Sequence, residues 1–538
     1  MKQLAIFVLT AASFAASIGS ISSDRLRAHV KYLASDRLEG RGVGTPGEKL
    51  ATDYIAKQFD SAGVRPAGDN GGFFQRVPMV GATTEPTATL SVSGHGQKAS
   101  FRWIDDYVGV SELQKPEDQF DAEAIFVGHG IVAPEFQWDD FKGVDVKGKV
   151  LVLFTNEPPS TDPKFFGGRA LTYYGRWVYK YEEAARHGAK AVFIIHTTPT
   201  AGYGWEVVRN SWSGEDAQMK LEPGAPALAF AAWFTREAGE KVLAMSGHHI
   251  DELLKAANSR DFHPIPLGIR VAANIPTKVR AIESRNVVAM VPGSDPKLRS
   301  EAVLFTAHWD HLGVGPAVNG DKIYNGAVDN ATGCAILMEL ARAWAALPEK
   351  PKRSAIFAAV TAEEAGLRGS EYYAAHPVIP LGKTALDLNF DSFFPFGRTT
   401  DISVGGAERT TVWPVVEAVA KRMNLTIKPD PHPEQGHFYR SDHFSLAHAG
   451  VPSFSVSLGT DYEGKSPEYG LKLFEQYNAE HYHQPSDEYH NDWDFGGMEE
   501  VAQFAMQVAT AVANQQALPT WHAGDEFLPA RERSRGHK

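Results

Sequence analysis

Cysteine is nearly absent from this sequence: Cys334 is the only one among 538 residues. A single cysteine forms no disulfide within the chain, and it excludes zinc sites that are built from several cysteines. Any metal ion must therefore be held by His, Asp and Glu side chains. Cys334 lies in an apolar stretch with helical periodicity, which favours a small core residue over a nucleophile.

Basic residues are fewer than acidic residues. The chain has 53 Lys and Arg against 65 Asp and Glu, which gives a formal net charge of −12 at pH 7. Binding of a polyphosphate requires a basic face, so we expect no nucleic-acid partner. The 43% of hydrophobic and 22% of charged residues are typical of a soluble globular protein. The length exceeds one compact core and predicts two or three domains.

Long apolar runs are missing except near the first residue. No later segment approaches the roughly 18 consecutive apolar residues of a membrane span, so we expect none. Lys2 precedes an apolar run from Leu4 to Ala16, and small residues follow it. This pattern indicates a secretory signal peptide over residues 1–19, and hence a periplasmic or secreted protein. The alternative is a buried N-terminal helix.

Two motifs of other enzyme classes lack the context that they need. The stretch Gly40–Gly47 contains a match to G-x-G-x-x-G, but no strand precedes it, which argues against a dinucleotide site. No G-x-S-x-G turn follows a strand, which argues against a serine hydrolase. We interpret the glycine-rich stretch as a loop between two helices in the region Asp24–Gly63.

The middle of the chain differs from its C-terminal half. Residues 120–266 contain short β-rich runs and no cluster of potential metal ligands, which predicts an inserted, non-catalytic domain. From residue 286 onwards strands alternate with helices, which predicts an α/β fold with a mainly parallel sheet flanked by helices. The expected parts are a signal peptide (1–19), the first part of the main domain (20–119), the insert (120–266), the main part (267–515) and a loose tail (516–538).

Acidic and imidazole side chains follow the predicted strands of this sheet. Functional groups gather at the carboxyl ends of strands in open α/β sheets. Each cluster alone has an ordinary explanation, such as a helix cap. Together, buried carboxylates would repel one another unless a cation neutralises them, and two Zn²⁺ ions accept both ligand types. The strands are Asn286–Val291, Val303–Thr306, Ala355–Val360, Leu386–Phe390 and Ser453–Ser457, and the clusters are 308–311, 325–333, 363–364, 391–392 and 480–488.

These segments resemble the ordered motifs of the bacterial secreted di-zinc aminopeptidases, to which transferrin receptor and glutamate carboxypeptidase are more distantly related. The resemblance implies the zinc-exopeptidase fold, which is phosphorylase/hydrolase-like. The stretch Leu33–Arg41 resembles the N-terminal stretch of that family, and residues 120–266 resemble its protease-associated domain. The matching segments are Ala307–Asp310, Val328–Gly333, Ala362–Gly366, Asn389–Asp391 and Tyr482–His483.

The resemblance implies a ligand set for two zinc ions per chain. His308 and Asp391 would hold one ion, and Glu364 and His483 the other. Asp329 would bridge the pair, because one carboxylate can hold two metals about 3.5–4 Å apart.

The resemblance also implies roles in the chemistry. A hydroxide bound to the two zinc ions would attack the peptide bond, with Glu363 as general base. Asp310 would orient the imidazole of His308. Tyr482 would help to stabilise the oxyanion, and simple packing is the alternative for this residue. The stretch Arg440–His443 is interpreted as a turn that enters the next helix.

Several functions stay open at this point. Aminopeptidase activity on peptide substrates leads by analogy, and carboxypeptidase or dipeptidase activity of the same fold is the alternative. A single-zinc glutaminyl cyclase would lack ligands of the second metal, whereas all five are present. A receptor-like binding protein without catalysis is disfavoured by the pair Glu363-Glu364. Side-chain preference and oligomeric state are left open by the sequence.

Overall fold

The computed structural model describes residues 21–536, so the predicted signal peptide lies outside the described residues. The described chain divides into two units, each compact by itself. The first unit contains residues 21–77, 283–430 and 440–536, and the second contains residues 78–282 and 431–439. The range 120–266 lies within the second unit, which extends further at both ends. Its identity as a protease-associated domain stays a prediction.

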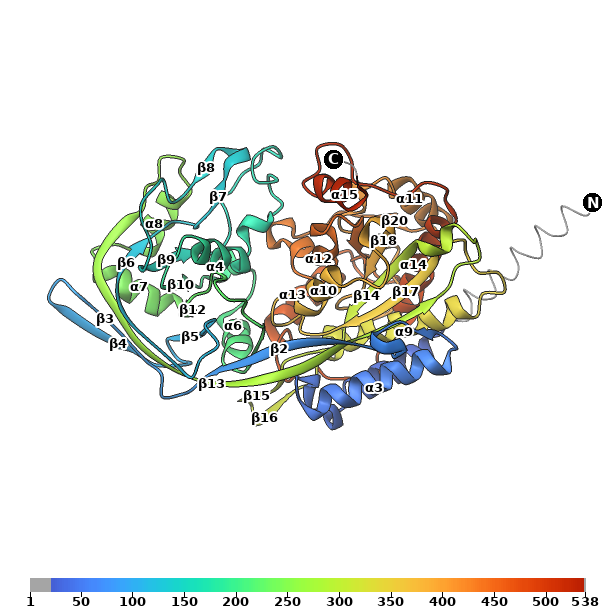
Figure 1. The fold of residues 1–538 in the computed structure, drawn as a ribbon, viewed down its shortest axis with the longest axis horizontal. Helices are drawn as coiled ribbons and strands as arrows, with labels where there is room; N and C mark the ends of the chain where they lie inside the picture. The colour runs from blue at the N-terminus through green and yellow to red at the C-terminus, as the bar shows by residue number, and fades with distance from the viewer. Residues whose placement is uncertain (1–20, 537–538) are drawn as a thin grey trace, which may run out of the picture. The chain divides into compact units, whose positions relative to one another are not determined.

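A mainly parallel sheet forms the centre of the first unit (Figure 1). Its strands lie in the order β21, β18, β14, β17, β13; the first four are parallel, and β13 is antiparallel to β17. This confirms the predicted fold class. The bounds are β13 (Ile265–Val291), β14 (Ala302–His308), β17 (Ser354–Val360), β18 (Thr384–Asn389) and β21 (Ser453–Ser455), with short strands β1 (Arg65–Pro66), β15 (Gly313–Val318), β16 (Asp321–Tyr324), β19 (Asp401–Ser403), β20 (Thr426–Ile427) and β22 (Ser457–Leu458).

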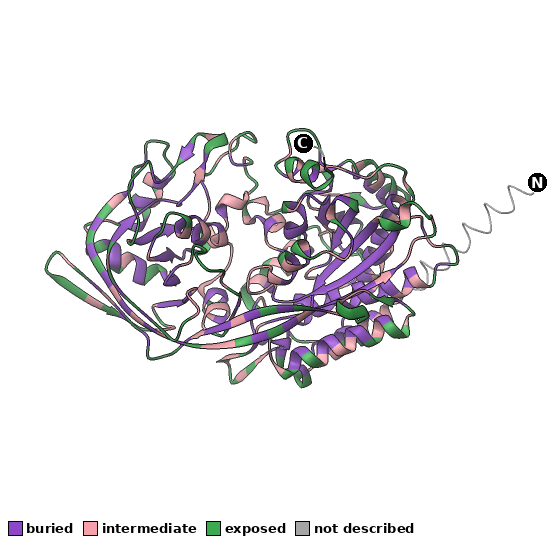
Figure 2. Cartoon of the chain, viewed as in Figure 1, coloured by how far each residue is buried: buried purple, intermediate pink, exposed green. Residues whose placement is uncertain are grey.

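Helices cover both faces of this sheet, because its central strands are apolar on both sides. In β14, Phe305 packs into one hydrophobic cluster and Leu304 into another. Helices α9 and α14 cover the first face, and α10 and α12 the second. Strands β14, β17 and β18 are buried along their whole length (Figure 2), and Cys334 is a buried residue of α9, as expected. The helices are α2 (Ser23–Leu33), α3 (Pro46–Ser61), α9 (Thr332–Ala345), α10 (Arg368–Ala375), α11 (Trp413–Arg422), α12 (His443–His448), α13 (Tyr469–Glu480), α14 (Gly496–Asn514) and α15 (Leu528–Ser534).

The C-terminal segment, which we expected to be a loose tail, contains helix α15 and buried side chains within its described residues. Arg531 of α15 is fully buried and donates hydrogen bonds to the carbonyls of Leu381 (3.0 Å) and Pro519 (2.9 Å). The indole of Trp521 is also buried and donates to the carbonyl of Gly450 (3.1 Å). Two anchoring side chains suffice to dock the segment, and its polar composition conceals them.

The second unit contains a parallel sheet of its own. Strands β6, β9, β10 and β12 run parallel, and β5 pairs antiparallel to β12. Strand β13 pairs with β6 and β3 through its first half. The bounds are β2 (Phe74–Thr84), β3 (Thr89–Gly94), β4 (Gln97–Phe101), β5 (Tyr107–Val110), β6 (Glu117–Phe126), β7 (Val132–Ala133), β8 (Trp138–Asp139), β9 (Val150–Phe154), β10 (Ala191–Ile195), β11 (Asp216–Met219) and β12 (Phe230–Phe234).

Five helices accompany this sheet, and two hydrophobic clusters lie on its two faces. The helices are α4 (Trp177–Arg186), α5 (Thr198–Ala201), α6 (Trp205–Trp212), α7 (Arg236–Ala244) and α8 (Ile250–Ala257). In the described part of the chain, no helix combines the length and the apolar character that crossing a membrane requires.

Candidate metal centre

The predicted ligands follow strands whose carboxyl ends share one edge of the first sheet. His308 is the last residue of β14 and pairs in register with Val360, the last residue of β17. On the other side of β14, Thr306 pairs with Asn389, the last residue of β18. The turns that follow these strands therefore start side by side. The parallel register is what brings residues far apart in the sequence to one place.

Asp329 lies between two histidines. Its Oδ1 is 3.3 Å from Nε2 of His308, and its Oδ2 is 3.4 Å from Nε2 of His483. The same nitrogen of His308 lies 3.2 Å from Oδ1 of Asp391. The same nitrogen of His483 lies 3.1 Å from Oε2 of Glu364. The structure thus brings all five predicted ligands together, in two groups of three that share Asp329.

This donor set fits zinc. Zinc bonds to nitrogen and carboxylate oxygen are about 2.0–2.2 Å long, so tetrahedral angles place neighbouring ligand atoms about 3.3–3.6 Å apart. The measured nitrogen–oxygen distances within each group, 3.1–3.4 Å, are close to that range. The histidine His308 is fully buried, and Asp329 and His483 are nearly so. Buried carboxylates around such a point call for a cation.

The protonation of the cluster follows from burial and from its neighbours. Burial alone would raise the pKa of Asp329, but hydrogen bonds from His308 and His483 outweigh it and lower the pKa well below its usual range. Burial raises the pKa of Glu363 well above its usual range, and the nearby carboxylates of Glu364 and Asp391 add to the rise although His308 opposes it. Glu363 is thus the acidic group of the cluster that most readily keeps a proton.

Asp310 supports the pair Glu363-Glu364. Its Oδ1 accepts a hydrogen bond from the amide of Glu363 (3.2 Å), and its Oδ2 accepts one from the amide of Glu364 (3.4 Å). We expected this carboxylate to orient His308, yet its Oδ1 is 3.9 Å from Nδ1 of His308, beyond hydrogen-bond distance. The main-chain oxygen of Asp310 lies 3.2 Å from that Nδ1 instead. The Asp310 carboxylate therefore bonds to the two main-chain amides of the turn after β17 and not to the imidazole of His308.

His311 belongs to the centre, although the sequence suggested no role for it. Its Nδ1 lies 2.6 Å from Oε1 of Glu364. Its Nε2 is buried and has no hydrogen-bond partner among residues 21–536. His311, Asp329 and Glu364 form a group of side chains that could hold a metal ion. The sequence feature that could have identified His311 is its position three residues after His308, on the same turn.

The turn before α12 contacts two of the predicted site residues. The Oγ of Ser441 donates to Oδ2 of Asp391 (2.6 Å) and accepts from Nδ2 of Asn389 (2.7 Å). The guanidinium of Arg440 donates to the hydroxyl of Tyr482 (3.1 Å). The stretch does form the expected turn, but sequence reasoning missed these contacts, which depend on residues 42 or more positions away.

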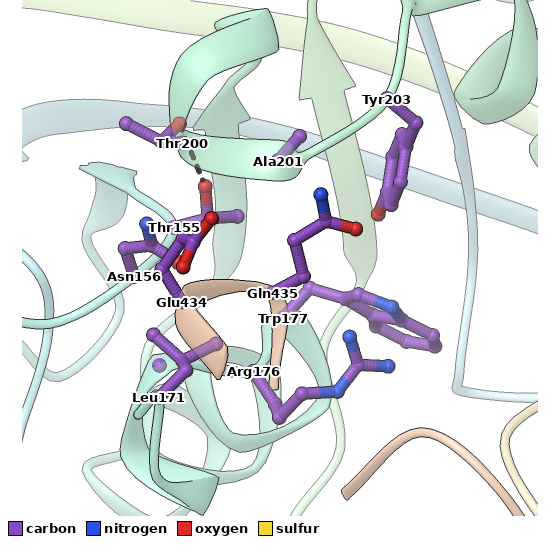
Figure 3. A pocket seen from close by; sticks show the side chains of 11 residues that line it. Thr155, Asn156, Leu171, Arg176, Trp177, Thr200, Ala201, Tyr203, Glu434 and Gln435 are labelled. Atoms are coloured by element: carbon purple, nitrogen blue, oxygen red, sulfur yellow. Dashed lines mark hydrogen bonds between the residues drawn. The ribbon is translucent and has the colours of Figure 1, made fainter. Parts of the chain in front are cut away.

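The second unit contains a pocket of a different kind (Figure 3). Thr155 follows β9 and lines it, and its hydroxyl donates to that of Thr200 (3.0 Å). Trp177 and Tyr203 add aromatic walls, and Gln435 lines it as well. Among the described residues, groups that could hold a metal occur only in the first unit. The chemistry of this pocket is therefore unlike that of the centre around Asp329.

Comparison with known proteins links the region of the centre to a peptidase family. Residues 286–509 match the family described as Peptidase family M28. This range contains all the predicted ligands together with Asp310, Glu363 and Tyr482. This part of the chain is thus similar to a peptidase family, as the sequence motifs predicted.

Curated relatives and a solved structure agree with that match. A "Probable zinc metalloprotease" of Pyrenophora tritici-repentis is 40% identical over 104 residues, 19% of this chain and 20% of the relative. A "probable leucine aminopeptidase 2" of Aspergillus oryzae is 36% identical over 107 residues, 20% of this chain and 19% of the relative. The chain thus spans about a fifth of the length of these relatives. The aminopeptidase from Aneurinibacillus sp. strain AM-1 has the same fold, with a TM-score of 0.54 at 20% identity over 94% of this chain and 98% of that one.

Proposed function

We propose that this chain is a zinc-dependent exopeptidase that hydrolyses peptides, with an aminopeptidase as the leading form. The observation that carries the proposal is the placement of Asp329, whose two carboxylate oxygens face His308 and His483 separately. Such a shared carboxylate is what a two-metal hydrolase requires. The M28 match over residues 286–509 and the name of the Pyrenophora relative support zinc as the metal.

Each ion would have three protein ligands. His308 and Asp391 would hold one ion, Glu364 and His483 the other, and Asp329 both. When bound, zinc acidifies a coordinated water and polarises a carbonyl oxygen. With three protein ligands each, the two ions would keep positions open for water and substrate, as catalytic zinc sites do.

Glu363 is the proposed general base. It is not part of either group of three around Asp329, and its raised pKa suits a group that must accept and return a proton. It would take a proton from the attacking water and pass it to the leaving amine. Asp310 accepts hydrogen bonds from the amides of Glu363 and Glu364 and so holds the main chain that carries both carboxylates.

Tyr482 is the proposed donor to the oxyanion of the tetrahedral intermediate. Its ring centroid is 4.0 Å from that of His483, so it lies at the edge of the ligand set. The guanidinium of Arg440 donates to its hydroxyl oxygen, and a phenolic hydroxyl can itself act as a hydrogen-bond donor. Tyr482→Phe should lower kcat and leave zinc binding intact.

Cleavage at the amino end is the form that the relatives' names favour. The test uses pairs of short peptides that differ only in whether the N-terminal amine is free or acetylated. An aminopeptidase cuts the free peptides and spares the acetylated ones. Cleavage of acetylated peptides from their carboxyl end would establish a carboxypeptidase instead, and cleavage limited to dipeptides would establish a dipeptidase.

We also propose that the protein is exported to the periplasm or the medium and that residues 120–266 form a protease-associated domain. The apolar run from Leu4 to Ala16 after Lys2 supports export. The absence of potential metal-ligand groups from the described second unit supports a non-catalytic domain. N-terminal sequencing of the mature protein from its native host tests export, since processing should occur near residue 19.

A further inference from the structure

Arg41 is a fully buried arginine beside the metal centre, in the glycine-rich loop near the N-terminus. Its Nε donates to the carbonyl of Trp309 (2.7 Å). Its Nη1 donates to the carbonyls of Leu33 (2.8 Å) and Asn325 (2.6 Å), and its Nη2 to that of Gly326 (2.9 Å). Among the described residues, no carboxylate lies within salt-bridge distance of it. Four of its five N–H groups thus hold main-chain oxygens.

Three of these carbonyls, those of Trp309, Asn325 and Gly326, belong to the two turns that present the metal ligands. Trp309 follows His308 directly, and Gly326 lies three residues before Asp329. One planar guanidinium therefore ties the turn after β14 to the turn before α9. Lysine could not reproduce this, because its ammonium is a single point with three donors.

The turn that carries Asp329 is held from both ends. Arg41 takes the carbonyls of Asn325 and Gly326. The carboxylate of Asp487 takes the amides of Val328 (2.9 Å) and Asp329 (3.1 Å). A cation on the carbonyl side and an anion on the amide side leave this stretch of main chain little freedom.

The loop of Arg41 adopts an unfavourable conformation to achieve this. Glu39, Gly40 and Arg41 all have positive φ values, of 45°, 66° and 51°. A Cβ atom on Gly40 would lie 2.3 Å from the carbonyl oxygen of Tyr324 and 2.5 Å from that of Gly313. Burying a charged guanidinium is also costly. Backbone strain of this kind is typically retained at functional sites.

We propose that Arg41 is a positioning residue of the metal centre, which holds the turns of His308 and Asp329 at the separation that two zinc ions require. The inference rests on the proposed function and adds a residue to it from outside the range that matches the peptidase family. Arg41 touches neither the proposed ligands' side chains nor the substrate. It acts through the main chain alone.

The test compares Arg41 with a matched arginine. Arg531 is equally buried and donates to two carbonyls, those of Leu381 and Pro519, but it contacts no residue of the centre. Arg41→Met, Arg41→Lys, Arg531→Met and Arg531→Lys are made in the full chain. Zinc affinity is measured by competition with a chromophoric chelator, and the visible spectrum is recorded after loading with Co²⁺. Thermal unfolding in excess chelator reports stability without metal.

The Arg41 variants should bind zinc about 10- to 100-fold more weakly than the wild type, the range seen when an outer contact of a metal ligand is lost. Their Co²⁺ spectra should change, with Arg41→Lys closer to the wild type. The Arg531 variants should lose stability but keep affinity and spectrum. If Arg41→Met does not fold, the comparison of Arg41→Lys with Arg531→Lys tests the inference.

Two outcomes separate the inference from the function on which it rests. Wild-type protein that takes up no zinc would overturn the proposed function and the inference with it. Wild-type protein that binds zinc, with Arg41 variants within twofold of its affinity, would overturn the inference alone. An equal loss of affinity in the Arg531 variants would do the same, since it would reduce the effect to stability.

Discussion

The two units build similar parallel sheets and place very different side chains at the strand ends. In the first unit His308 ends β14 and Asp391 lies two residues after β18, whereas Thr155 follows β9 of the second. Both units bury charge, but they balance it differently. In the second unit the carboxylates of Asp140 and Glu157 have the ammonium of Lys180 among the charges that act on them. The fold alone therefore does not specify a metal site; the donor set does.

In the first unit the charge of the buried Arg41 acts on Asp329 in a similar way, but the carboxylates there form a larger group. Asp329, Glu363, Glu364 and Asp391 face one another and histidines, and none of them forms a salt bridge to Lys or Arg among residues 21–536. A cluster of this kind is stable when a cation joins it. Substitutions of matched residues in the two units can test this contrast.

The largest effect is expected at Glu363. Glu363→Gln keeps the shape but removes the proton acceptor, so kcat should fall by about 10²-fold or more while zinc stays bound. Hydrolysis of a chromogenic peptide with a free amine and elemental analysis measure the two quantities. Glu157→Gln is the control: Glu157 is a buried carboxylate of the second unit bonded to Thr172, and its loss should leave kcat unchanged. Loss of zinc from Glu363→Gln would contradict its assignment as the base.

Asp329 should dominate metal content. The wild type is expected to carry about two zinc ions per chain, because one carboxylate serves both groups of ligands. Asp329→Ala should carry less than one, whereas Asp391→Ala should keep about one. Asp140→Asn in the second unit should match the wild type, since Asp140 bonds to the amide of Ile131 and to Trp138, within the second unit. Elemental analysis that finds one zinc or none in the wild type argues against a paired centre.

Substitution of His311 is expected to have a smaller effect on zinc binding. Its Nδ1 contacts Glu364, so His311→Ala should weaken zinc binding about 10-fold through loss of that contact. His129→Ala provides the control, because His129 is also buried but lies in the second unit and bonds to Thr155 and Asn258. Chelator competition measures both variants. Equal affinities of His311→Ala and the wild type would show that the contact does not orient Glu364.

The last prediction concerns stability in acid. Burial lowers the pKa of His129 from 6.5 to about 4, and the charge of Lys180 adds to this. Between these values the unfolded chain binds a proton that the folded chain does not, so stability is complete above pH 6.5 and is lost as the pH falls towards about 4. The loss amounts to at most about 3 kcal/mol. The free energy of unfolding, measured with denaturant at pH 7 and at pH 4.5, should differ less for His129→Gln than for the wild type. An equal difference in the two proteins would contradict this prediction.

The strands and the ligands were predictable because their signals are local. Apolar runs such as Ala355–Val360 identify the strands, and the ligands follow them directly. Knowing that the strands are parallel places His308 and Asp391 at one edge. The rule about strand ends gives only this location, and the assignment of individual ligands rests on the resemblance to the di-zinc aminopeptidases.

The supporting contacts were not predictable, because they are made to the main chain or over long separations. Asp310 bonds to two amides rather than to His308, and no sequence pattern distinguishes those partners. Arg41 reaches Trp309 across 268 positions. The contacts of Arg531 that dock the C-terminal segment could not be predicted for the same reason. Every residue has a main-chain carbonyl, so the sequence does not indicate which one accepts the hydrogen bond.

The segment Pro431–Tyr439 limits how the second unit can be removed or exchanged. It lies between β20 and α12 of the first unit, yet it belongs to the second, where the amide of Leu171 bonds to the carbonyl of Pro433 (2.9 Å). The next residue, Arg440, contacts Tyr482. A deletion that removed residues 78–282 as a cassette would leave this segment without its packing partners, one peptide bond from the site. Engineered chimaeras that exchange the second unit must therefore carry residues 431–439 with it.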